Sequence, residues 1–303
     1  MDEVELELED AHEHERLAEY CQRMQAEDEQ RRHEDMELQA QTAYLRMRLG
    51  DFYIRAGKID RALSEYKQAI KLDHRNAAFR TRLGDTYALK DMVQQAMTQY
   101  RMAIQCDPRL ADPRISLGDL YRRFGMFVQA MEQYQVAVDA EPTRAYFHFK
   151  LADSLIAVGR LLEAVSELKM VVQLDPGEAF YRFRLGDLYL KLGWLEQASA
   201  ELLKATRLAP YDDYYLIRYG VVSLATGRIV EAVDALRMAV RMEPNNRCYR
   251  VLLSDALSEA GMADEANRVM LQAGELDSYE LEFVGRRRLE CSRFAAADVA
   301  RPE

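Results

Sequence analysis

The sequence has few of the residue patterns that accompany catalysis or metal binding. It contains five histidines and four cysteines among 303 residues, and the cysteines are too far apart for a metal or redox motif. No P-loop, dinucleotide-binding glycine motif or nucleophile elbow is present. The chain is therefore predicted not to be an enzyme and to need no cofactor or metal. Its cysteines are expected to be free thiols, which favours a cytoplasmic location: Cys21, Cys106, Cys248 and Cys291.

Long apolar runs and basic surfaces are missing as well. No apolar stretch reaches the roughly 18 residues that a membrane-spanning helix needs, and the opening MDEVELELED lacks the basic and apolar parts of a signal peptide. The formal charge is −10, but residues 1–42 hold 15 acidic and 4 basic side chains, a net of −11, so the rest is near +1. We therefore predict no membrane span and no nucleic-acid partner, and an acidic N-terminal segment.

What the chain does have is a 34-residue period. Glycines recur at this spacing: Gly50, Gly84, Gly118, Gly186 and Gly220. Alanines do so without a gap: Ala62, Ala96, Ala130, Ala164, Ala198, Ala232 and Ala266. Prolines form a third series: Pro108, Pro142, Pro176, Pro210 and Pro244. A period of this length is typical of stacked helical repeats and not of one compact globule.

Each period reads as two helices separated by a short turn. In FYRFRLGDLYLKLGWLEQASAELLKATRLAP the apolar residues recur at helical spacing on both sides of Gly193. Glycine adopts the left-handed backbone of such a turn at little cost, and the proline near the end stops the second helix. The small residues, such as Gly84 and Ala96, are expected to let the two helices approach closely.

This order of Leu-Gly, Tyr, Gly, Ala, a bulky residue, Ala and Pro resembles the tetratricopeptide repeat. The resemblance implies an all-α fold, a right-handed superhelical solenoid of helix-turn-helix repeats, and a protein or peptide partner. Ser254, Leu257 and Ser278 depart from the pattern in the last unit, as is usual for a terminal repeat. Seven units cover 238 of the 303 residues: 43–76, 77–110, 111–144, 145–178, 179–212, 213–246 and 247–280.

The two ends lie outside these units. The composition of residues 1–42 favours a helix, although the alternation of Val4, Leu6 and Leu8 with Glu indicates a disordered motif in the first ten residues. Two interpretations of this segment stay open, a solvated helix leading into the first repeat and a docking element for a second copy or a partner. Residues 281–303 are predicted to form a capping helix and tail over the last repeat, with four apolar contacts: Leu281, Val284, Leu289 and Phe294.

In the family, the second, fifth, ninth and twelfth residues of each first helix line a concave groove, and we call this side the inner face. The ninth position is acidic in six units: Asp51, Asp85, Asp119, Asp153, Asp187 and Asp255, with Val221 as the exception. Two roles remain open for these carboxylates. They can pair with a basic residue three positions earlier on the same helix, as Asp187 would with Arg184, or they can bind a partner's Lys and Arg.

The inner-face positions of units four to six are mostly apolar. An apolar strip of this kind predicts a binding site for a protein segment with apolar anchors and Lys or Arg. The alternative is that some of its rings pack between neighbouring first helices as core. The candidate partner-binding residues are Tyr146, Phe149, Asp153, Ile156, Phe180, Phe183, Asp187, Leu190, Tyr214, Ile217 and Leu224.

The sequence thus predicts a non-enzymatic interaction scaffold or adaptor that binds a peptide or helical segment in its groove. Two alternatives remain. The chain can self-associate through its N-terminal helix, as a homo-oligomer, or it can be the recognition subunit of a separate enzyme such as a glycosyltransferase.

Overall fold

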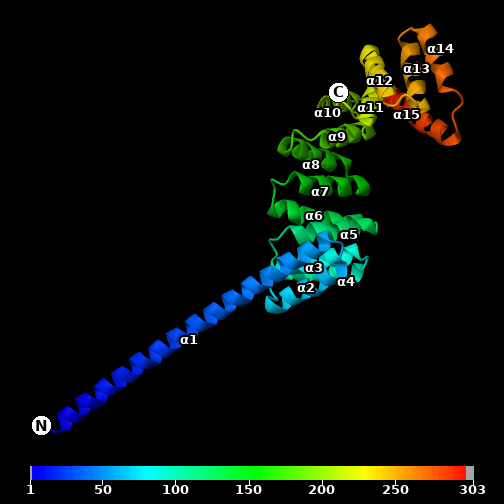
Figure 1. Cartoon of the computed structure of the whole chain (residues 1–303). Coiled ribbons are helices and arrows are strands. Elements are labelled where there is room, and N and C mark those ends of the chain that lie inside the picture. The colour runs from blue at the N-terminus through cyan, green and yellow to red at the C-terminus, as the bar shows by residue number, and fades with distance from the viewer. Residues whose placement is uncertain (1, 298–303) are drawn as a thin grey trace. The chain divides into compact units, whose positions relative to one another are not determined.

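The computed structural model describes the backbone of residues 2–297 and the side chains of residues 23–287. Between residues 2 and 297 all regular secondary structure is α-helical (Figure 1). The helices are α1 (Asp2–Arg55), α2 (Ile59–Leu72), α3 (Ala77–Leu89), α4 (Val93–Cys106), α5 (Asp112–Arg123), α6 (Phe127–Ala140), α7 (Ala145–Val158), α8 (Leu161–Leu174), α9 (Ala179–Lys191), α10 (Leu195–Leu208), α11 (Asp213–Ala225), α12 (Ile229–Met242), α13 (Arg247–Glu259), α14 (Ala263–Ala273) and α15 (Ser278–Ala297).

The helices follow the 34-residue period, which confirms the predicted all-α array of helix-turn-helix repeats. Helices α3, α7, α9, α11 and α13 begin at the first residues of their predicted units, and α5 begins one residue later. The turn between the two helices of a unit has a left-handed residue, such as Gly57 at φ 70° and Gly193 at φ 75°. In unit two Asp91 takes this place at φ 59°, a conformation that aspartate tolerates better than most residues.

Within each pair, the small residues set the distance between the helices, as predicted. A Cβ atom at Gly84 would lie 2.6 Å from the Tyr100 ring, and one at Gly186 would lie 2.9 Å from Leu202 Cγ. The alanine at the start of the second helix is fully buried, as at Ala96. A side chain at either glycine would therefore force the second helix away.

The chain divides into two compact units, one up to Leu120 and one from Tyr121 onward. The core of the first lies between α1, α2 and α3. There Leu63 and Tyr66 of α2 pack against Leu83 of α3, and Ala69 packs against Phe79. The second compact unit contains the hairpins from α7 to α14, together with α15.

Helix α1 is longer than the repeat requires. It runs for 54 residues without a break, through the predicted boundary at residue 42 (Figure 1). This helix includes residues 2–10, for which the sequence suggested a disordered motif. Residues 1–42 contain neither glycine nor proline, and acidic residues near a helix N-terminus are stabilised by the helix dipole.

Helix α15 packs mainly against α11 and α13, the first helices of units six and seven (Figure 1). Of its predicted apolar contacts, Val284 is 2% exposed and Leu281 is 59% exposed, while the side chains of Leu289 and Phe294 lie outside the described residues. Helix α15 therefore contacts the last repeat, for which the sequence predicted a cap, and also the first helix of unit six.

Candidate partner-binding surface

Three of the ninth-position carboxylates form an ion pair with an arginine of the following unit. Arg82 Nε lies 3.8 Å from Asp51 Oδ1, and Arg218 Nη2 lies 2.5 Å from Asp187 Oδ1. In each case the arginine occupies the sixth position of the next first helix. The pairs of this kind are Asp51–Arg82, Asp153–Arg184 and Asp187–Arg218. At Asp187 the structure does not show the pairing three residues back on the same helix, because Arg184 reaches Asp153 in the preceding unit.

Tyrosines of the second helices hold these carboxylates from the other side. Tyr66 Oη donates to Asp51 Oδ1 at 2.7 Å, and Tyr100 Oη donates to Asp85 Oδ1 at 2.8 Å. Ser116 Oγ, from the next first helix, is 3.3 Å from the same oxygen of Asp85. Burial raises the pKa of Asp85, while the hydrogen bonds from Tyr100 and Ser116 act to lower it. These aspartates therefore join helices within and between repeats.

A second row of contacts, which the sequence analysis missed, links the two helices of one unit. Arg46 Nη1 lies 2.8 Å from Glu65 Oε2, and His148 Nδ1 lies 2.6 Å from Glu167 Oε2. Both pairs are separated by 19 residues, and Arg182–Glu201 repeats the spacing. Charged residues at equal spacing in successive units are the sequence signal for this row. Its contacts join the two helices of a repeat and serve stability.

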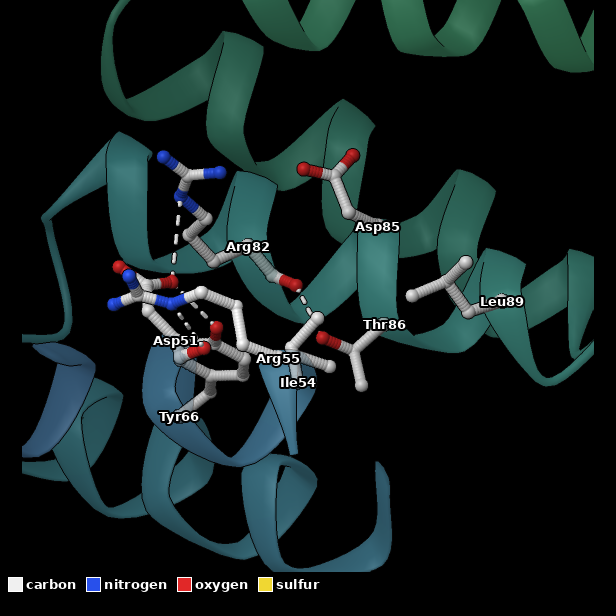
Figure 2. A pocket seen from close by; sticks show the side chains of 8 residues that line it. All are labelled: Asp51, Ile54, Arg55, Tyr66, Arg82, Asp85, Thr86 and Leu89. Atoms are coloured by element: carbon white, nitrogen blue, oxygen red, sulfur yellow. Dashed lines mark hydrogen bonds and ion pairs between the residues drawn. The ribbon is translucent and has the colours of Figure 1, made fainter. Parts of the chain in front are cut away.

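The inner face of the first compact unit has a pocket of about 310 Å³ between α1 and α3. Figure 2 shows Arg82 extending over Asp51, with the apolar side chains of Ile54 and Leu89 beside the opening. The lining combines two guanidinium groups, two carboxylates and an apolar wall. The lining residues are Asp51, Ile54, Arg55, Tyr66, Arg82, Asp85, Thr86 and Leu89.

The predicted apolar strip of units four to six is divided by the structure. Phe183, Leu190 and Ile217 are 8%, 4% and 0% exposed and belong to the core, which corrects the expectation of one continuous strip. Phe183 is covered by a ring at the third position of the next unit, since it stacks on Tyr215 with ring centroids 4.8 Å apart. The partly buried members are Phe149, Asp153, Ile156, Asp187 and Leu224.

Three rings at the second position of their units are exposed to solvent in part. We call them the aromatic row: Tyr146, Phe180 and Tyr214, at 46%, 38% and 40% exposure. They stand at equivalent positions of three successive first helices, α7, α9 and α11. Phe149 supports Phe180 edge-on at 5.4 Å. Arg184 Cζ lies 5.8 Å from the Phe180 ring centre. The row is thus an exposed aromatic surface, and buried or half-buried rings pack against Phe180 and Tyr214.

Helix α15 occupies one end of the aromatic row. Arg287 Nη2 donates to Tyr214 Oη at 3.3 Å, and its Cζ lies 5.8 Å from the Tyr214 ring centre and 5.2 Å from that of Phe283. Arg247 anchors the start of α15 through Glu280, at 2.7 Å. The exposure of Tyr146 and Phe180 leaves the rest of the row open.

Docking of α15 also covers Cys248, which is 7% exposed, and this predicts its reactivity. Burial, and then the nearby Glu280, raise the pKa of the Cys248 thiol, so that less thiolate is present near neutral pH. Iodoacetamide labelling followed by peptide mass mapping should modify Cys248 more slowly than exposed Cys106. Arg247→Ala, which removes the anchor of α15, should raise the Cys248 rate roughly tenfold without changing that of Cys106. Equal rates in the unmodified chain would contradict the docking.

Among the residues that the structure describes, no helix is both long and apolar enough to cross a membrane. No group of three His, Cys, Asp or Glu side chains within the same residues could hold a metal ion.

Family models and solved structures agree on the fold. Models described as TPR repeat and tetratricopeptide repeat match residues 50–91, 115–179 and 181–212. No curated protein matches the chain. Among solved structures, YrrB, described as a TPR protein with an unusual peptide-binding site, is 19% identical, with a TM-score of 0.53 over 59% of this chain and 92% of that one.

Two other solved structures are similar. The pilF protein of Pseudomonas aeruginosa is 15% identical, with a TM-score of 0.58 over 68% of this chain and 94% of that one. MamA is 22% identical, with a TM-score of 0.51 over 58% and 94%. At these identities the likeness concerns the fold, and it coincides with the repeat period, the matched family models and the paired helices. The chain is a tetratricopeptide repeat protein.

Proposed function

We propose that the chain is a non-catalytic scaffold that binds a segment of a partner protein along the aromatic row, chiefly at Tyr146 and Phe180. The observation that carries this proposal is the exposure of these rings at equivalent positions of successive first helices, while Phe183 and Ile217 are buried. Large aromatic side chains that stay exposed in rows are frequent anchors of protein interfaces. YrrB, a protein of the same fold, is described as having a peptide-binding site.

The contact between α15 and Tyr214 suggests the chemistry of the partner. Arg287 lies over the Tyr214 ring, with Phe283 on the same side of α15. A guanidinium over an aromatic face is a favourable contact. We therefore expect a partner segment that offers an apolar or aromatic residue and an arginine. Asp153 and Asp187 already hold Arg184 and Arg218, and Lys150 and Arg184 lie 5.0 and 5.8 Å from the ring centres of Tyr146 and Phe180. A partner's arginine over these rings would therefore replace one of these two cations.

Photo-cross-linking tests this proposal. Benzoylphenylalanine replaces Tyr146 or Phe180 in the full chain, and in a control it replaces Leu162 of α8, which is 63% exposed. After irradiation in a lysate of the source organism, both inner-face positions should trap the same partner segment, one that contains an aromatic or apolar residue and an arginine. Equal trapping of that segment from Leu162, or unrelated segments from the two inner-face positions, would contradict the proposal.

A further inference from the structure

A second exposed apolar surface lies on α1. Leu45, Leu49 and Phe52 are 67%, 39% and 57% exposed, and Leu38, seven residues before Leu45, is 63% exposed. These four side chains recur at intervals of seven, four and three residues, so they share one side of the helix. We call them the α1 face. It does not belong to the aromatic row.

In later units, the positions of the α1 face are covered by a helix. Leu45, Leu49 and Phe52 are the third, seventh and tenth residues of their unit. Their equivalents on α3 and α7 are buried: Phe79, Leu83, Thr86, Phe147, Leu151 and Ser154.

The covering element is the second helix of the preceding unit. On α3, Phe79 packs on Ala69 of α2, and Leu83 packs on Leu63 of the same helix. The α1 face therefore has the shape and composition of a surface that receives a helix. In the described part of the chain no such helix precedes it, because residues 2–42 continue α1 itself.

We propose that the α1 face binds the α1 face of a second copy of this chain, with the two helices antiparallel. The face is self-complementary about Leu45. An antiparallel pair centred there places Leu45 opposite Leu45 of the second copy, and Leu38 opposite Phe52. The seam from Leu38 to Phe52 is about 21 Å long at about 1.5 Å per residue. A two-fold contact of this kind uses each residue twice and closes at two copies.

The charges at the two ends of the seam agree with this arrangement. In the same register, Asp35 of one copy faces Arg55 of the other, and the symmetry repeats the pair at the opposite end. Both residues are exposed in the single chain. Since α1 ends at Arg55, the two ion pairs mark the limits of the contact. This reciprocity favours a second copy over an unrelated helix.

Light scattering of the full chain after gel filtration tests this inference. The measured molar mass should be twice the 35.0 kDa of one chain. Leu45→Glu should raise the dissociation constant of the dimer roughly 100-fold, and Leu162→Glu, a matched change at an exposed leucine of α8, should leave it unchanged. Because Leu45 is 67% exposed, circular dichroism of Leu45→Glu should match that of the original chain. A monomer at all concentrations, or an unchanged dimer of Leu45→Glu, would overturn the inference.

Two further variants test the register. Asp35→Arg should weaken the dimer, and combining it with Arg55→Asp should restore it. Leu45→Cys should give an interchain disulfide under mild oxidation, because the symmetry places this residue opposite itself. Failure of the charge exchange to restore the dimer, or no disulfide at position 45 in an otherwise dimeric chain, would reject the antiparallel arrangement.

Discussion

Replacing Asp187 by valine is expected to lower the free energy of unfolding by about 3–5 kcal/mol, the usual cost of removing one partner from a buried ion pair. The side chain of Arg218 is only 4% exposed, and Asp187 is its carboxylate partner at 2.5 Å. The variant removes the negative charge beside a guanidinium that is buried. Urea denaturation of the full chain, followed by circular dichroism, measures the change.

Another unit of the chain shows which second substitution should restore the stability of this variant. In the next unit the same two positions hold Val221 and Leu252, which are 5% and 4% exposed. Asp187→Val together with Arg218→Leu should therefore recover most of the lost stability, because the buried guanidinium is removed together with its carboxylate partner. A single variant as stable as the original chain, or a double variant less stable than the single one, would contradict the inter-repeat role of these pairs.

Changing Tyr146 and Phe180 together to alanine is expected to weaken binding of the cross-linked partner segment by about 2–4 kcal/mol, a loss of roughly 30- to 1,000-fold in affinity. Both rings are exposed on the aromatic row, so their contact area is available to a partner. Titration calorimetry with the segment as a synthetic peptide measures the effect.

Stability provides the control for this experiment. Because Tyr146 and Phe180 are 46% and 38% exposed, the double variant should unfold at nearly the same urea concentration as the original chain. Phe183→Ala, in contrast, removes a core ring and should cost about 3–5 kcal/mol of folding energy. Leu162→Ala should change neither property. Full affinity in the folded double variant would show that the partner lies elsewhere.

The fold was readable from the sequence because the repeat imposes the same packing several times. Gly84 and Gly186 stand where a Cβ atom would meet the facing helix, and only glycine meets that demand without displacement. Six of the predicted unit starts are within one residue of a helix start. The periodicity therefore fixed both the helix boundaries and the close contacts inside each hairpin.

The partners of the inner-face residues were harder to predict. Spacing along one helix suggested Arg184 for Asp187, whereas the structure pairs Arg184 with Asp153. Only an alignment of successive units reveals that the ninth position of one first helix meets the sixth position of the next. At Val221 and Leu252 these two positions are both apolar, whereas other units have an aspartate and an arginine there. This joint change is the sequence signal for the contact.

The aromatic residues show a similar limit. Phe180 and Phe183 are both rings on the inner face of α9, and their composition and spacing do not distinguish an anchor from core. The distinction comes from the next unit, where Tyr215 stacks on Phe183. Likewise, the sequence predicted α15 as a helix, but its placement depends on contacts such as Arg247 with Glu280, 33 residues away.

Hydrogen–deuterium exchange of the full chain, with and without the cross-linked partner segment, tests the aromatic row most directly. The account predicts slower amide exchange in α7 and α9, which carry Tyr146 and Phe180, and unchanged exchange in α8 and α10. Protection confined to helices that do not carry the row, with α7 and α9 unaffected, would contradict it.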